Sequence, residues 1–147
     1  MNVATVREGR DRYLAANSLS VESYKSGRFP IYIGRRPLWV PNPGFLPWHD
    51  LHHVATGYST GLIGEAEISA YELRAGCGSL MIFMLCVGAI FIALFVAPGR
   101  VFRAWKLAKG SRSLYHTKVP YEHLLEMSLV DLRKHLGLPL QGCASIE

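Results

Sequence analysis

The sequence feature that most constrains the fold is a set of four metal-ligand side chains in the pattern His-Asp-x-x-His-x11-Glu: His49, Asp50, His53 and Glu65. His49 and His53 are four residues apart, so a helix places them one turn apart on the same face. Asp50 lies about 100° round that helix from His49. An unbroken helix would carry Glu65 about 18 Å beyond His53. The chain must therefore turn back, which predicts a two-helix clamp around one ion.

The segment Gly57-Tyr58-Ser59-Thr60-Gly61 has the composition of the required turn. Its two glycines permit backbone dihedrals that other residues rarely adopt, and Ser59 or Thr60 is expected to cap the second helix. The alternative is that the His and Asp side chains form a solvated helix face and that Glu65 is an ordinary surface residue.

The ligand set comprises two imidazoles and two carboxylates and has no thiolate. It suits zinc, iron, manganese or cobalt, and zinc is the first expectation. Structural zinc sites in small domains more often use cysteine, so the mixed nitrogen and oxygen set favours a catalytic ion with an open position. We expect Glu65 and Asp50 to be catalytic as well as ligating, with Glu65 handling a proton. His52 neighbours the site and is expected to support a ligand or to relay a proton.

Around these residues the chain resembles the ubiquinone (coenzyme Q) biosynthesis protein four family. The hallmark of that family is the same His-Asp-x-x-His-x11-Glu pattern. The flanking residues also match: Trp48, Val54-x-Thr56-Gly57 and Gly64-Glu65. A second similar stretch comprises Ala104–Gly110, Pro120–Leu125 and Ser128–Leu138. The resemblance spans roughly residues 35–139, and residues 1–34 lie outside it.

The resemblance implies a helical fold and a role in the quinone pathway, where the family is linked to replacing the ring carboxylate of a polyprenylated hydroxybenzoate by hydroxyl. The expected substrate is therefore a lipophilic, prenylated ring, and the expected enzyme is a metal-dependent lyase or decarboxylase. One alternative is a cyclase or lyase of a secondary-metabolite pathway. Another is a lipid-binding scaffold without catalysis, acting in a biosynthetic complex or as a homo-oligomer.

Length and composition predict one mostly α-helical domain, because 147 residues can bury a core without disulfides. We divide the chain into an N-terminal helix and arm (1–34), the helical metal-binding domain (35–139) and a tail (140–147). The formal net charge of +5 favours anionic partners, but no nucleic-acid-binding motif is present and nucleic acid is not expected. The odd number of cysteines, three, fits a reducing compartment. We expect a cytoplasmic protein with peripheral contact at the inner membrane.

Two segments before the ligand pattern have clear local preferences. Val3 to Ala16 is predicted to form a short polar helix. Pro30 to Trp48 contains five prolines and cannot be a regular helix. It is predicted to be an extended arm that lies across the domain, with Pro47 in the first turn of the ligand-bearing helix.

No charged residue lies between Arg74 and Arg100. Three interpretations fit the apolar run of residues 75–98: a transmembrane helix, a fully buried core helix, or an interfacial helix that opens a pocket onto a membrane. Burial is favoured, because the segments on both sides of the run resemble parts of one domain. The basic series that follows is interpreted as either a solvated helix surface or an anion-binding, membrane-facing patch: Arg100, Arg103, Lys106 and Lys109.

The last predicted helix has the clearest boundaries. Ser128 and Asp131 form a pair of the capping-box type, and Gly137 follows the last apolar residue of the stripe. This helix is expected to be purely structural.

Overall fold

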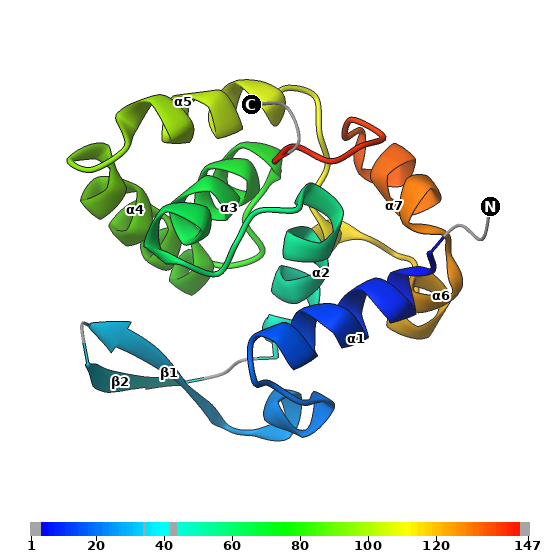
Figure 1. Cartoon of the computed structure of the whole chain (residues 1–147), viewed down its shortest axis with the longest axis horizontal. Helices are drawn as coiled ribbons and strands as arrows, with labels where there is room; N and C mark the ends of the chain where they lie inside the picture. The colour runs from blue at the N-terminus through cyan, green and yellow to red at the C-terminus, as the bar shows by residue number, and fades with distance from the viewer. Residues whose placement is uncertain (1–3, 34, 42–43, 145–147) are drawn as a thin grey trace.

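The computed structural model of the chain describes residues 4–33, 35–41 and 44–144. The fold is mostly helical, as predicted, and the helices pack around a central pair, α2 and α3 (Figure 1). The described elements are, in chain order, α1 Val6–Ala16, the 3-10 helix η1 Val21–Lys25, β1 Arg28–Ile33, β2 Arg36–Pro41, α2 Leu46–Thr56, α3 Leu62–Ala75, α4 Leu80–Leu94, α5 Pro98–Leu107, the 3-10 helix η2 Leu114–His116, α6 Tyr121–Glu126 and α7 Leu129–Leu136.

Helix α1 is the polar N-terminal helix that the sequence predicts. Thr5 and Glu8 form a capping box at its start, in which each side chain accepts a hydrogen bond from the other residue's backbone N–H. Val6 and Leu14 are buried on its inner face, so the helix joins the core despite its polar composition. Val3, where the predicted helix begins, lies outside the described residues.

The proline-rich arm is extended, but it forms a β-hairpin instead of a single strand lying across the domain. Strands β1 and β2 pair antiparallel from Arg28 opposite Pro41 to Ile33 opposite Arg36. A two-stranded hairpin tolerates proline, because each strand has an edge whose N–H groups need no partner. β2 is largely exposed, and the hairpin lies beside the helical body (Figure 1).

The predicted two-helix clamp is formed by α2 and α3. Pro47 lies in the first turn of α2, and Gly57 ends that helix in the left-handed conformation with φ of 83°. Gly61 is the N-cap of α3 and no side chain caps this helix, so the expected capping by Ser59 or Thr60 is wrong. The Thr60 hydroxyl instead donates to Asn17 Oδ1, which ties the turn to the end of α1.

The apolar run forms α4, which packs against α3 and is followed by α5. Among the described residues, no helix combines the length and the apolarity needed to cross a bilayer. The interpretation of a fully buried core helix is wrong, because only Ile82, Cys86 and Ala93 of α4 are buried. Helix α4 packs mainly against α3 and less closely against α5, so the side chains on its remaining surface stay exposed.

The rest of the core lies where α1, α2, α6 and α7 meet. Leu51 and Ala55 of α2 are fully buried there, together with apolar residues of the two C-terminal helices: Leu124, Leu125, Leu132 and Leu136. The cap of α7 is as predicted: the Asp131 backbone N–H donates to Ser128 Oγ, and Gly137 ends the helix with φ of 71°.

The close approach of the turn to α3 depends on Gly64. A Cβ atom at Gly64 would lie 2.0 Å from the backbone oxygen of Ser59, a contact that only backbone movement can relieve. We therefore expect Gly64→Ala to lower the free energy of unfolding by about 3 kcal/mol, the upper part of the range for overpacking. Denaturant-induced unfolding measures this change.

Gly88→Ala is the matched control, because Gly88 lies in α4 and a Cβ there meets no atom within 4 Å. This control should leave stability unchanged or raise it by up to about 1 kcal/mol. Equal destabilisation by the two substitutions would contradict the packing described for the turn.

Candidate metal centre

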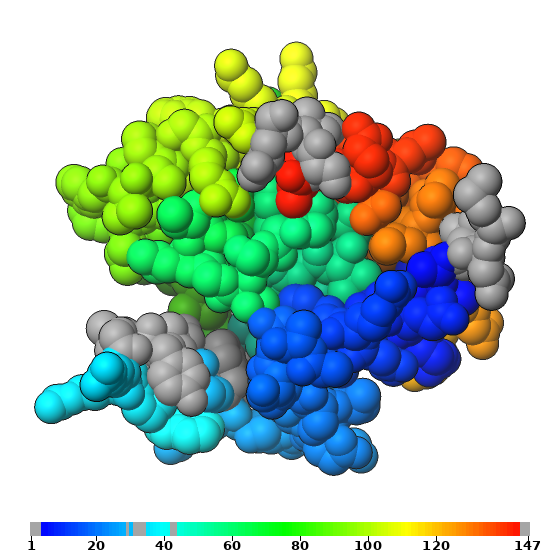
Figure 2. All heavy atoms as spheres, in the orientation of Figure 1, coloured from blue at the N-terminus to red at the C-terminus, as the bar shows by residue number. Residues whose placement is uncertain are grey.

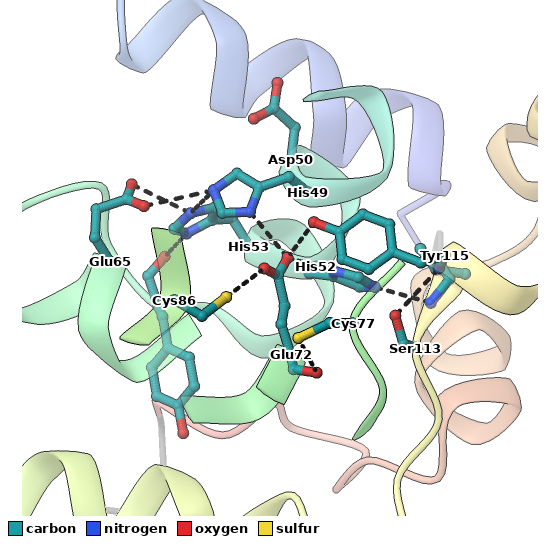
Figure 3. Close-up of polar contacts among 12 residues, drawn as sticks. His49, Asp50, His52, His53, Glu65, Glu72, Cys77, Cys86, Ser113 and Tyr115 are labelled. Atoms are coloured by element: carbon teal, nitrogen blue, oxygen red, sulfur yellow. Dashed lines mark hydrogen bonds and ion pairs between the residues drawn. The ribbon is translucent and has the colours of Figure 1, made fainter. Parts of the chain in front are cut away.

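The clamp gathers three of the four predicted ligands at one point. His49 and His53 project from the same face of α2, and Glu65 projects from the first turn of α3 toward both imidazoles (Figure 3). One ligand atom from each of these residues lies within 4.8 Å of the others.

The separations between these atoms are those expected around a small cation. His49 Nε2 and His53 Nε2 are 3.2 Å apart, and each lies 3.4 Å from an oxygen of Glu65. Ligands bound about 2.0–2.1 Å from a tetrahedral zinc ion lie about 3.3 Å from one another. The two imidazoles contact different oxygens of Glu65, Oε2 and Oε1 respectively, so the three side chains surround one point at close to the spacing of a tetrahedral shell and leave room for a further ligand.

The hydrogen bonds of the other ring nitrogens determine which nitrogen of each imidazole faces this point. His53 Nδ1 lies 2.9 Å from the backbone oxygen of Tyr58, which can only accept, so Nδ1 carries the proton. His49 Nδ1 donates in the same way to Glu72 Oε1 at 2.9 Å. Both Nε2 atoms thus face the centre. At 3.2 Å from each other, they require a cation between them, either a proton or a metal ion.

Glu72, which the sequence analysis missed, organises the interior side of this centre. Its side chain is almost fully buried, and its Oε1 accepts hydrogen bonds from His49 Nδ1, from His52 Nδ1 at 2.7 Å and from the Tyr115 hydroxyl at 2.8 Å (Figure 3). Burial raises the pKa of this carboxyl, but the charge and hydrogen bond of His49 and the hydrogen bond of His52 outweigh burial and lower it strongly. Glu72 is therefore a buried carboxylate held by its donors.

The sequence did hold a signal for Glu72. It follows Glu65 by seven residues, and two turns of helix place both carboxylates on the same side of α3. A carboxylate–histidine–metal arrangement needs such a second carboxylate behind a ligating imidazole.

His52 supports the centre from behind and does not belong to the ligand group. Its Nε2 accepts a hydrogen bond from the Leu114 backbone N–H at 2.9 Å, and its Nδ1 donates to Glu72. Burial lowers the pKa of this imidazole, consistent with a neutral ring that has one proton. With both nitrogens occupied, His52 links Glu72 to the η2 segment, as expected of a residue that supports a ligand.

The structure does not bring Asp50 into the ligand group, which corrects the expectation of a fourth ligand. Its carboxylate points away from the centre (Figure 3). It accepts hydrogen bonds from the Tyr13 hydroxyl at 3.2 Å and the Tyr24 hydroxyl at 2.7 Å. The angle of about 100° between successive residues on a helix separates it from the face shared by His49 and His53. The Tyr13 ring stacks on His53 with ring centroids 5.4 Å apart, so this tyrosine connects Asp50 to a residue of the centre.

The centre is accessible from the side of Glu65. The Glu65 side chain is 36% exposed, that of His49 is 16% exposed, and that of His53 is fully buried. Burial raises the pKa of Glu65, but the hydrogen bonds to His49 and His53 outweigh it and lower the pKa to about 2. Burial lowers the pKa of His49, but Glu72 and Glu65 together raise it well above its ordinary value. Glu65 is thus ionised and ready to bind a cation at neutral pH.

A shallow pocket of about 230 Å³ lies near His49. It adjoins the centre through Phe45, whose ring meets His49 edge to face, and through Tyr115, which hydrogen-bonds Glu72. Its remaining lining comes from the first turns of α2 and α4 and from the residues just before these helices: Gly44, Trp48, Gly78, Ser79 and Ile82.

Comparison with known proteins leaves the site to be interpreted from its own geometry, because no protein-family model and no curated protein matches the chain.

Glu72→Gln tests the role of the buried carboxylate. The substitution keeps the shape but removes the negative charge and leaves one acceptor oxygen in place of two, so the hydrogen bonds from the imidazoles become weaker. We expect affinity for a divalent ion to fall about 10–100-fold, the usual effect of removing a hydrogen-bond partner from a ligating histidine. Titration with zinc against a competing chelator measures this affinity.

Glu67→Gln is the matched control, since Glu67 is also buried on α3 but pairs with Arg100 through two 2.8 Å hydrogen bonds. This control should leave zinc affinity unchanged. An equal loss in both variants would mean that burial of charge on α3, and not the contact with His49, determines the affinity.

Proposed function

We propose that His49, His53 and Glu65 bind one divalent metal ion and that the chain is a metal-dependent enzyme acting on a lipophilic ring substrate. The observation that carries the proposal is the pair of Nε2 atoms that face each other at 3.2 Å with a carboxylate beside them, an arrangement in which a divalent ion can replace a shared proton. A solvated His face offers no reason for two imidazoles and a carboxylate to direct their polar atoms at one point.

The donor set favours a catalytic ion over a structural one. Two imidazoles and one carboxylate form the ligand set of several catalytic zinc sites and of non-haem iron oxygenases, and both kinds of site keep positions open for a substrate or water. Zinc fits the tetrahedral spacing, and iron, manganese and cobalt accept the same ligands. The ion would act as a Lewis acid on a phenolate or carboxylate oxygen.

The remaining roles, which are to orient the imidazoles and to transfer a proton, belong to different residues. Glu72 and the Tyr58 carbonyl hold the imidazoles in the ligating tautomer. Glu65 comes from a different helix than the two histidines and is the most exposed of the three, so it can exchange a proton with an entering substrate. We assign Glu65 this role in addition to ligation.

The resemblance to the ubiquinone biosynthesis protein four family supports a substrate with a prenylated ring and a reaction of the decarboxylase or lyase type. The structure adds apolar surface in the neighbourhood of the centre. Helix α4 begins at the pocket beside Phe45, and its uncharged side chains offer a path for a hydrocarbon chain. Burial of such a chain contributes about 0.8 kcal/mol per CH₂.

Metal analysis and a substitution series test this proposal. The purified protein should bind about one divalent ion per chain, and His53→Ala should lose it. Glu65→Gln should retain the ion more weakly, while product formation in a quinone-pathway strain falls at least about a hundredfold, the scale for losing a general acid or base. Glu126→Gln, an exposed glutamate of α6, is the control and should leave both quantities unchanged.

Full product formation by a well-folded Glu65→Gln variant would contradict the enzymatic role. If this variant also kept its ion, a non-catalytic scaffold would explain the result better. Equal metal content in wild type and His53→Ala would contradict the metal site itself.

A further inference from the structure

The end of the molecule formed by α4 and α5 exposes apolar side chains that the proposed chemistry does not require. The turn between the two helices projects at one end of the molecule, away from α6 and α7 (Figure 1), and its atoms form the upper part of that end, with the hairpin below them (Figure 2). Large apolar residues around this turn are exposed, and we call the five most exposed of them the apolar tip: Phe91, Ile92, Phe95, Val96 and Phe102. Phe95 is 77% exposed, although a single well-packed domain normally shields such a ring.

Charge is segregated around the apolar tip. The chain has eleven Asp and Glu residues, and none of them lies between Ala75 and Tyr121. The same segment contains six Lys and Arg residues, among them the exposed Arg103, Lys106 and Lys109 that follow the tip along α5. The apolar tip is therefore next to cations and has no acidic residue near it in the sequence. Such a surface is complementary to a partner with an anionic surface and an apolar interior.

We propose that the apolar tip binds the surface of an anionic phospholipid bilayer. A helix rises 1.5 Å per residue, so Arg103 lies about 10 Å and Lys106 about 15 Å along the chain direction from Val96. Interfacial segments bury their apolar side chains about 5–10 Å deep. With the tip directed into the bilayer, these cations reach the level of the lipid phosphates, where each contributes to binding.

A second copy of the chain is the other candidate for covering the tip, and charge disfavours it. Two copies that met through their tips would bring both basic α5 segments together, with no Asp or Glu of residues 75–121 to offset the repulsion. Trp105 also fits a membrane interface, since it is exposed on α5 and lies beneath the Arg74 guanidinium at 5.0 Å. The proposal does not depend on the metal centre.

Vesicle flotation of the full, zinc-loaded chain tests the proposal. The probe is vesicles of phosphatidylcholine with about one third phosphatidylglycerol, compared with vesicles of phosphatidylcholine alone. We expect wild type to bind the anionic vesicles at least about tenfold more strongly, because surface potential adds to apolar insertion. The double variants Phe95→Ser/Val96→Ser and Arg103→Glu/Lys106→Glu should each weaken this binding at least about tenfold.

Two controls match these changes in kind and number. Leu19→Ser/Val21→Ser replaces two exposed apolar residues around η1, and Lys25→Glu/Lys134→Glu makes the same change in net charge on other surfaces. Both controls should bind vesicles within about twofold of wild type. Zinc content should be unchanged in all four variants, and vesicle binding should survive Glu65→Gln, which separates this proposal from the proposed metal chemistry.

Three results would overturn the proposal. The first is an absence of flotation by wild type with anionic vesicles. The second is an equal loss of binding in the matched controls, which would indicate attraction through net charge alone. The third has two parts: wild type is a dimer by sedimentation equilibrium and Phe95→Ser/Val96→Ser is a monomer, and neither protein floats with the vesicles. This result would mean that the apolar tip binds a second copy of the chain.

Discussion

The contact between the buried Glu72 carboxylate and the imidazole of His49 is the interaction on which the candidate centre depends. It assigns the proton to Nδ1 and directs Nε2 at His53 and Glu65. The same carboxylate accepts from His52 and Tyr115 and so joins α2, α3 and the η2 segment. A buried charge is costly unless donors surround it, and the donors that stabilise this one are also the groups that shape the ion site.

The turn between α2 and α3 explains why three ligands from two helices meet. Gly57 ends α2 with a positive φ, and Gly64 lets the Ser59 backbone lie directly against α3. This close contact sets Glu65 opposite the two histidines. The clamp was predictable from the sequence, because helical periodicity and the span of twelve residues from His53 to Glu65 are local geometry. The proline in the first turn of α2 and the cap of α7 were predictable for the same reason.

The parts that the sequence did not predict correctly depend on tertiary neighbours. Asp50 has the chemistry of a ligand, but Tyr13 and Tyr24, far from it in the chain, take its carboxylate. Glu72 was missed because its partners come from three separate segments. The apolar run was expected to be buried because of its hydrophobicity. Hydrophobicity alone does not indicate which faces of a helix pack against other helices. In the structure α3 covers one face of α4, and the residues around the α4–α5 turn stay exposed.

The most direct measurement of the central claim is X-ray absorption at the zinc edge on the zinc-loaded protein. The geometry predicts an inner shell of nitrogen and oxygen at about 2.0–2.1 Å with the outer-shell scattering of two imidazoles, and no sulfur shell. His53→Ala should remove one imidazole from that signal or abolish zinc binding. A sulfur shell near 2.3 Å, which would place zinc on Cys77 or Cys86, would contradict the account, as would an ion without imidazole scattering.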